Sequence, residues 1–198
     1  MVDNKILTEY RGARENIKKN TLGYHRRPCL IRAPYDPIDD REVDDPALLI
    51  QHGRFYTQDS YPDPELFATA GVLARKFSPD YLLVHPMGMD YVGETYGADS
   101  SEYRNHAIFQ DVALANLIPE WLAGGYSVLV TGDHGMNKDK LHGGTTPDVR
   151  EVPLYLIRPA TEEMGNTGTS VSQLQIAPTV CRLLDVPIPE TMRQPSIV

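Results

Sequence analysis

Apolar side chains along this chain fall into two kinds of segment, short continuous runs and longer stretches with helical periodicity. The continuous runs have the length of strands that are covered on both faces; they are residues 29–33, 81–84, 127–130 and 154–157. The periodic stretches predict helices; they are residues 65–77, 100–122 and 171–184. Strands interleaved with helices predict an α/β fold with a layered, mostly parallel sheet and helices on both faces.

Proline and glycine mark the interruptions in this pattern. A Gly-Gly pair ends the long helix, and Pro119 is predicted to kink or divide it. The segment of residues 34–64 is rich in Pro, Asp and Tyr and is predicted to be a long irregular connection. We therefore expect two regions, an irregular one at residues 1–64 and a folded domain at residues 65–190.

Composition narrows the classes of function. The 198 residues carry a formal net charge of −8, which argues against binding a nucleic-acid polymer through phosphate neutralisation. No apolar run approaches the length of a membrane-spanning helix. Cys29 and Cys181 are interpreted as small buried hydrophobes rather than as redox groups. If Met1 is the natural start, the charged amino terminus lacks a signal-peptide core and a cytoplasmic protein is expected.

Acidic and histidine side chains gather where the predicted strands end. Asp133 and His134 follow the third predicted strand directly, and His142 comes eight residues after His134 in a glycine-rich loop. Asp90 and Glu94 follow the second predicted strand and are four residues apart, so one helical turn places both on one face. Five such ligands are too many for one tetrahedral zinc ion, so they predict two adjacent ions.

Simpler interpretations exist for each of these side chains. An Asp-His pair after a strand can be a turn aspartate and a surface histidine, and Asp90 with Glu94 can be a solvated helix face. His142 can merely end a loop. Because three such groups coincide at the strand ends of one predicted sheet, we favour the metal site. His85 and His106 are interpreted as structural.

Three segments carry a family resemblance when they are taken together. They are Val-Thr-Gly-Asp-His-Gly-Met at residues 130–136, Leu-His-Gly-Gly-Thr-Thr-Pro at residues 141–147 with the following 151–154, and residues 175–189. These segments resemble the alkaline phosphatase superfamily, in the branch of the nucleotide pyrophosphatases and phosphodiesterases. The resemblance covers about residues 65–190, as the carboxyl-terminal part of such a domain.

The resemblance implies a site with two divalent ions, Zn²⁺ or Mn²⁺. Asp133 and His134 would bind the ion on the nucleophile side, together with an aspartate upstream. Asp90, Glu94 and His142 would bind the other ion. Residues 136–140 with Thr145 and Thr146 are expected to line the mouth of the site, although Asn137, Lys138 and Lys140 are better interpreted as solvated loop residues.

Two departures from the family pattern change this expectation. Glu94 stands where the family has a histidine, which shifts the preference towards harder ions such as Mn²⁺. The family's Ser or Thr nucleophile and its upstream aspartate have no counterpart within residues 1–64. We therefore expect the chain to be the carboxyl-terminal part of a longer enzyme.

The function predicted for that enzyme is metal-dependent phosphohydrolase or phosphodiesterase activity on a small phosphate ester. The isolated chain is expected to be weakly active or inactive, because the nucleophile segment is not found in it. The alternatives are a metal-binding module or pseudoenzyme without a nucleophile, and a structural remnant that binds no metal. Surface left uncovered by the missing amino-terminal part is expected to favour oligomers.

Overall fold

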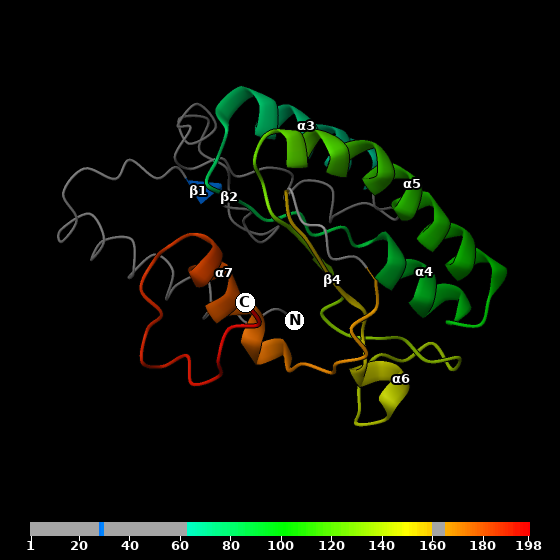
Figure 1. The fold of residues 1–198 in the computed structure, drawn as a ribbon. Coiled ribbons are helices and arrows are strands. Elements are labelled where there is room, and N and C mark those ends of the chain that lie inside the picture. The colour runs from blue at the N-terminus through cyan, green and yellow to red at the C-terminus, as the bar shows by residue number, and fades with distance from the viewer. Residues whose placement is uncertain (1–27, 30–62, 160–164) are drawn as a thin grey trace, which may run out of the picture.

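The computed structural model describes residues 28–29, 63–159 and 165–198. The elements are, in order, β1 (Pro28–Cys29), α3 (Asp63–Phe77), β2 (Tyr81–Leu82), α4 (Gly88–Tyr96), α5 (Ser101–Ala123), β3 (Val128–Thr131), α6 (Pro147–Arg150), β4 (Leu154–Ile157), η2 (Gln173–Gln175) and α7 (Ile176–Leu183). Helices and short strands interleave along the chain, which is the predicted α/β class (Figure 1). The strand predicted at residues 30–33 and the irregular region up to residue 62 lie outside the described residues.

The strands of the described residues form two separate pairs. β1 and β2 are parallel, with Pro28 opposite Tyr81, whereas β3 and β4 are antiparallel, with Val128 opposite Ile157. The expected layered, mostly parallel sheet is thus not seen in this part of the chain. A continuous apolar run marks a buried strand but carries no information on the direction of its partner, so the antiparallel β3–β4 pair was not foreseen.

The core lies between the two long helices and the strands. Ala70 and Ala74 of α3, Trp121 of α5 and Val128 of β3 are buried together. Partly buried side chains complete this cluster, from Leu82, Val84, Leu114, Leu117, Ile118, Leu122, Tyr126, Val130 and Ile157. In Figure 1, α3 and α5 run side by side along one edge of the molecule, and α4 lies beside the amino-terminal half of α5. The apolar stripes of α3 and α5 thus hold the strands from which the loops of the site emerge.

The longest helix tests whether Pro119 divides it. α5 is one uninterrupted helix from Ser101 to Ala123, so Pro119 does not divide it. Its amino terminus is capped by Ser100, whose Oγ accepts a hydrogen bond from the Tyr103 amide at 3.0 Å. Trp121 follows two residues after the proline and is buried in the core. The packing of this last turn therefore outweighs the one backbone hydrogen bond that proline cannot donate.

The carboxyl-terminal helix is shorter than predicted. The pattern at residues 171–184 predicts one helix, but the structure has the short 3₁₀-helix η2 followed by α7 at Ile176–Leu183. Ser172 and Gln175 form a reciprocal capping box at the start of η2. Thr179 is fully buried, and its hydroxyl accepts a hydrogen bond from the Ile197 amide at 2.9 Å. This bond fastens the end of the chain to α7.

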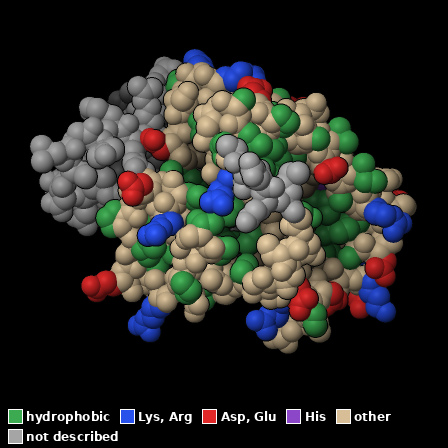
Figure 2. All heavy atoms as spheres, viewed as in Figure 1, with side chains coloured by type: hydrophobic (Ala, Val, Ile, Leu, Met, Phe, Trp, Pro, Cys, Tyr) green, Lys and Arg blue, Asp and Glu red, His purple; other side chains and the backbone are tan. Residues whose placement is uncertain are grey.

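The surface of the described residues mixes apolar and charged side chains (Figure 2). Ile108 and Val112 of α5 and Tyr155 of β4 are each more than half exposed. Among the described residues, no helix combines the length and the apolar character that crossing a bilayer requires.

Candidate metal centre

Helix α4 supplies two of the five predicted ligands. Asp90 and Glu94 lie one turn apart in Gly88–Tyr96, so the expected shared helix face is present. The helix ends at Gly97, whose φ of 87° lies in the left-handed region that favours glycine. A Cβ at this position would lie 2.6 Å from the Lys138 carbonyl oxygen. α4 therefore ends in close backbone contact with the loop that carries the histidines.

The loop after β3 supplies the other three predicted ligands, Asp133, His134 and His142. Gly135 follows the first two, and a Cβ there would lie 2.1 Å from the Asp148 carbonyl oxygen of α6. The Gly135 amide donates a hydrogen bond to the Val149 carbonyl at 2.9 Å. Glycine at this position thus lets the loop pass directly against the backbone of α6, and this contact sets the direction of the preceding ligands.

Asn137 closes the segment between His134 and His142. Its side-chain oxygen accepts a hydrogen bond from the Leu141 amide at 2.9 Å, and its own amide donates to the Leu141 carbonyl at 2.9 Å. Its carbonyl accepts from the Ala98 amide at 3.1 Å, just beyond α4. The sequence suggested an ordinary solvated loop residue, but Asn137 organises the turn that brings His142 back to α4.

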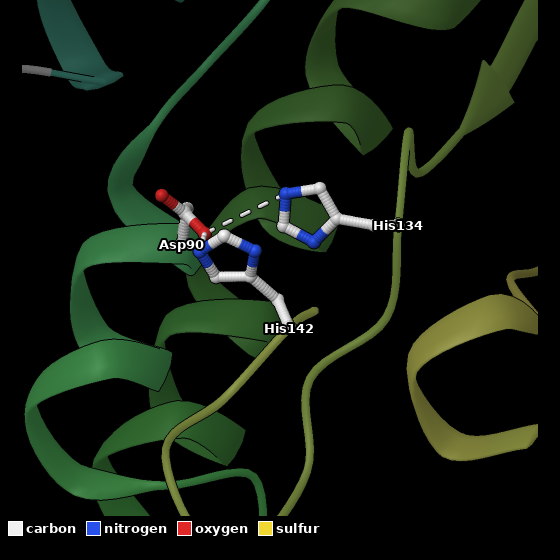
Figure 3. A group of neighbouring side chains, drawn as sticks. All are labelled: Asp90, His134 and His142. Carbon is white, nitrogen blue, oxygen red and sulfur yellow. Dashed lines mark ion pairs between the residues drawn. The ribbon is translucent and has the colours of Figure 1, made fainter. Parts of the chain in front are cut away.

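Asp90, His134 and His142 converge on one point (Figure 3). The Oδ1 atom of Asp90 lies 3.7 Å from His134 Nε2 and 3.8 Å from His142 Nε2. The two imidazole rings are stacked, with centroids 4.4 Å apart. One ligand atom from each residue lies within 4.8 Å of the others. Ligands of one tetrahedral ion at bond lengths near 2.1 Å are about 3.4 Å apart, so a small contraction would enclose an ion.

The protonation of His134 suits this geometry. Its Nδ1 atom lies 2.9 Å from the Gly135 carbonyl oxygen, which can only accept, so Nδ1 carries the proton. Nε2 is then the ring nitrogen on the side of Asp90, where it can bind a cation through its lone pair. A metal-binding histidine usually donates a hydrogen bond of this kind from the ring nitrogen that does not bind the metal.

Asp90 Oδ1 is the most telling atom of the group. It is buried and has no hydrogen-bond partner among the described residues. A buried carboxylate oxygen without a partner is costly, because its desolvation is not offset. A divalent cation between Asp90 and the two imidazoles would remove that cost.

The two remaining predicted ligands flank this group. Glu94 Oε1 lies 3.1 Å from His142 Nε2, on one side. Asp133 Oδ1 lies 3.8 Å from His134 Nε2, on the other. All five predicted residues are thus brought into one connected cluster. The central group joins His134 to Asp90 and His142, although the family resemblance assigns His134 to one ion and the other two residues to the second ion. The division of the ligands between two ions stays a prediction.

His85 is a neighbour that sequence reasoning missed. Its Nε2 atom lies 3.8 Å from Asp133 Oδ2, although it was interpreted as structural without a partner. It follows β2, the strand that leads into α4. The position directly after a strand was the available signal, since Asp133 was singled out for the same reason.

Side chains beneath the cluster support it. Met136, in the loop expected to line the mouth of the site, is instead buried with 6% of its surface exposed. Tyr103 lies beside it, and burial raises the pKa of the Tyr103 hydroxyl above its usual range, with the charge of Asp90 raising it further. The hydroxyl therefore stays protonated near Asp90 at neutral pH.

The carboxyl-terminal segment also touches the site. The amide group of Gln173 donates hydrogen bonds to the carbonyl oxygens of Gly132 at 3.1 Å and Asp133 at 3.0 Å. These bonds cross about forty residues of sequence. They fasten the backbone of the loop after β3 to η2. The local sequence around Gln173 gives no indication of this contact.

The family described as type I phosphodiesterase / nucleotide pyrophosphatase has a sequence model that matches residues 32–142. All five candidate ligands, Asp90, Glu94, Asp133, His134 and His142, fall within that span. The match begins before the region of the predicted domain, inside residues that the structure does not describe.

Several curated proteins are similar to the chain. GPI ethanolamine phosphate transferase 2 of Candida albicans is 30% identical over 122 residues, which cover 56% of this chain and 14% of that protein. The catalytic subunit of human GPI ethanolamine phosphate transferase 3 is 30% identical over 114 residues, covering 56% of this chain and 10% of that protein. The chain thus matches only about a tenth to a seventh of the length of these two relatives. No solved structure gives a significant match.

Proposed function

The chain belongs to the type I phosphodiesterase / nucleotide pyrophosphatase family, and we propose from this that it holds the metal-binding part of a domain that cleaves phosphate esters. One observation carries the proposal. The buried Oδ1 atom of Asp90 has no hydrogen-bond partner among the described residues and faces the Nε2 atoms of His134 and His142. A cation is the partner that this arrangement lacks.

The donor set fits a divalent ion. One carboxylate and two imidazoles are the ligands of many catalytic zinc sites, and they leave a position open for substrate. Glu94 and Asp133 extend the set on either side, as a second ion requires. The additional carboxylates favour an ion that accepts hard oxygen ligands, so we propose Mn²⁺ as well as Zn²⁺. Such ions, when bound, neutralise charge on a phosphoryl group and lower the pKa of an attacking oxygen.

The chain's own residues prepare the site for that chemistry. The Gly135 carbonyl accepts a hydrogen bond from the proton-bearing Nδ1 of His134, so Nε2 is the nitrogen that would bind the ion. The backbone contact between Gly135 and α6 fixes the loop, and Asn137 returns the chain to bring His142 over α4. The ligand loop is therefore held by backbone contacts at Gly135 and at Asn137, which limits the reorganisation needed for binding.

The identity of the acceptor separates two versions of this function. Water as the acceptor gives the hydrolase that the sequence predicts. The curated relatives are named as ethanolamine phosphate transferases, which favours an alcohol as the acceptor. We propose transfer of a phosphoethanolamine-like group for the whole protein, with hydrolysis as the slower competing reaction.

The nucleophile bears on the alternative function. A Ser or Thr nucleophile, implied by the family resemblance, has no counterpart in the sequence of residues 1–64. A module that binds metal without turnover is therefore the competing proposal. In the whole protein, we further propose that the two strand pairs belong to one layered sheet, and that the exposed Ile108, Val112 and Tyr155 contact other parts of it.

Metal binding by this chain is the first test. Equilibrium dialysis against Mn²⁺ and against Zn²⁺ should give bound metal for the wild type and a loss of at least tenfold in affinity for Asp90→Asn. Asp111→Asn removes an exposed carboxylate from α5 and should bind as the wild type does. Equal binding by all three proteins would overturn the proposal.

Turnover is tested with the full-length gene product. Release of nitrophenol from bis(p-nitrophenyl) phosphate reports cleavage. Transfer is measured with labelled phosphatidylethanolamine and an added glycoside, whose hydroxyl takes the phosphoethanolamine group while diacylglycerol is released. Transfer exceeding hydrolysis, with both lost in His142→Ala, supports the transferase version. Hydrolysis alone supports the hydrolase version, and metal binding without either reaction supports the module without a nucleophile.

A further inference from the structure

A second polar cluster lies at the other end of α4 from the loop contacts. Its centre is Asp63, the first residue of α3, whose side chain is only 2% exposed. Asp63 Oδ2 lies 2.9 Å from His106 Nε2 and accepts a hydrogen bond from Gln110 Nε2 at 3.0 Å, both from α5. Asp63 Oδ1 accepts a hydrogen bond from the Gly88 amide at 3.2 Å, at the start of α4. One carboxylate thus joins three helices.

This carboxylate takes the place of a local helix cap. Met87 precedes α4 and provides no side-chain hydrogen bond to the first turn. The Gly88 amide is instead satisfied by Asp63, which is 25 residues away in the sequence. A negative charge at this end also interacts favourably with the helix dipole. The start of α4 is therefore fixed from α3 and α5 rather than from its own sequence.

The contact is tight enough to set the position of α4. A Cβ on residue 88 would lie 2.2 Å from His106 Nε2 and 2.3 Å from Asp63 Oδ2. Only glycine allows the backbone to approach so closely. Gly88 is two residues before Asp90 in the same helix, so a displacement of the helix start moves the ligand directly.

We propose that Asp63, His106 and Gln110 are positioning residues for the metal centre. They hold the start of α4 so that Asp90 faces His134 and His142. The inference rests on the proposed metal function for its purpose, but the mechanical part, the anchoring of α4, stands on the hydrogen bonds themselves. Sequence reasoning left His106 as a structural residue of the long helix, and its partner Asp63 lies 43 residues away.

His106 offers the sharpest test. His106→Ala removes the donor to Asp63, whereas His106→Gln places an amide Nε2 where it can donate in its stead. Arg75→Met is the matched control, because Arg75 on α3 pairs with Glu120 on α5 at 2.8 Å on the surface. That variant loosens the same two helices without touching α4. All variants are compared as folded proteins by circular dichroism.

Two readouts separate the inference from the function on which it rests. Hydrogen exchange measures the protection of the amides of Gly88–Tyr96 without metal, and Mn²⁺ titration followed by electron paramagnetic resonance measures affinity. His106→Ala should increase exchange in α4 at least tenfold and weaken Mn²⁺ binding by about 10- to 100-fold. His106→Gln should recover most of both, and Arg75→Met should change neither.

The outcomes are distinguishable. Unchanged α4 exchange in folded His106→Ala, or an equal change in Arg75→Met, would overturn the anchoring. Loosened α4 with unchanged Mn²⁺ affinity would overturn the positioning role. A wild type that binds no Mn²⁺ would refute the metal function and with it the purpose of the anchor, while hydrogen exchange would still decide the anchoring itself.

Discussion

Met136 packs against the backbone of Gly93 in the middle of α4. A Cβ at residue 93 would lie 2.7 Å from Met136 Cε and 2.8 Å from Met136 Cγ. Met136, the methionine of the Asp-His-Gly-Met segment, therefore contacts Gly93, which lies between Asp90 and Glu94. This contact packs α4 against the loop that carries Asp133 and His134. Glycine leaves the space for the contact, and the flexible methionine side chain fills it.

Gly93→Ala is expected to disrupt the contact between α4 and Met136. The added methyl group meets Met136 and Tyr103 in a buried contact, so either the loop or α4 must shift. Overpacking of this kind costs about 1–3 kcal/mol of unfolding free energy. Mn²⁺ affinity should fall at the same time, because Asp90 and Glu94 flank the substitution. Urea unfolding and metal titration measure the two effects.

Gly143→Ala is the control for that substitution. A Cβ at residue 143 has no heavy atom within 4 Å, and this glycine lies directly after the ligand His142. Its unfolding free energy should stay within about 0.5 kcal/mol of the wild type. Equal destabilisation by the two variants would mean that the Gly93–Met136 contact is not what seats α4.

Metal removal is expected to lower thermal stability through linkage. An ion that binds only the folded chain stabilises it by about 2.7 kcal/mol at 100 times its Kd. Mn²⁺ should therefore raise the melting temperature, and a chelator should reverse the rise. Asp90→Asn should reduce the rise strongly and Glu94→Gln should reduce it less, since Glu94 lies beside the central group rather than within it. Differential scanning calorimetry with and without Mn²⁺ checks this order, and a larger loss in Glu94→Gln would contradict it.

Local features of the site could be predicted from the sequence, because they depend on spacing alone. Asp90 and Glu94 share a helix face since they are four residues apart, and His134 follows a strand end. The helices over residues 65–77 and 100–122 were found within two residues at each end, because their apolar periodicity is long and regular. Whether these residues bind metal is a prediction that the experiments above decide.

Features that depend on distant contacts could not be predicted. His85 next to Asp133 and Asp63 next to His106 join residues more than forty positions apart. The antiparallel pairing of β3 and β4 depends on the path of the connecting loop, which apolar content does not encode. The pattern of apolar residues along the sequence indicates which face of a helix or strand is buried, but not which other element packs against that face.

The thiol of Cys181 gives a prediction for pH dependence. Burial raises the pKa of this half-buried thiol above its usual range. At a given pH near 8 it therefore holds less thiolate than a free cysteine, so iodoacetamide should react with it more slowly and with a midpoint at higher pH. The raised pKa also makes stability depend on pH. The thiol of the unfolded chain loses its proton at a lower pH than the folded chain does, so the free energy of unfolding falls as pH rises past the ordinary thiol pKa.

The alkylation is measured in a Cys29→Ser background, in which Cys181 is the only thiol left in the chain. The matched control is the same protein unfolded in urea, where the thiol should titrate as in a free peptide. A midpoint at or below that of the unfolded chain would contradict the raised pKa.

Gln173→Ala is expected to loosen the ligand loop from the carboxyl-terminal segment. The variant removes the two hydrogen bonds that the side chain donates to the Gly132 and Asp133 carbonyls. Partly exposed bonds of this kind contribute about 1 kcal/mol to unfolding free energy. Mn²⁺ affinity should fall by about tenfold, because the freed backbone carries Asp133 and His134.

Leu174→Ala is the neighbouring control, since Leu174 is 71% exposed and should change neither quantity. The decisive comparison is between stability and affinity. If the bonds only close the fold, Gln173→Ala lowers stability while leaving Mn²⁺ affinity at the wild-type value. If they hold the ligand loop, affinity falls even at temperatures where every variant is fully folded, and that is the result we expect from bonds made to the backbone of Asp133 itself.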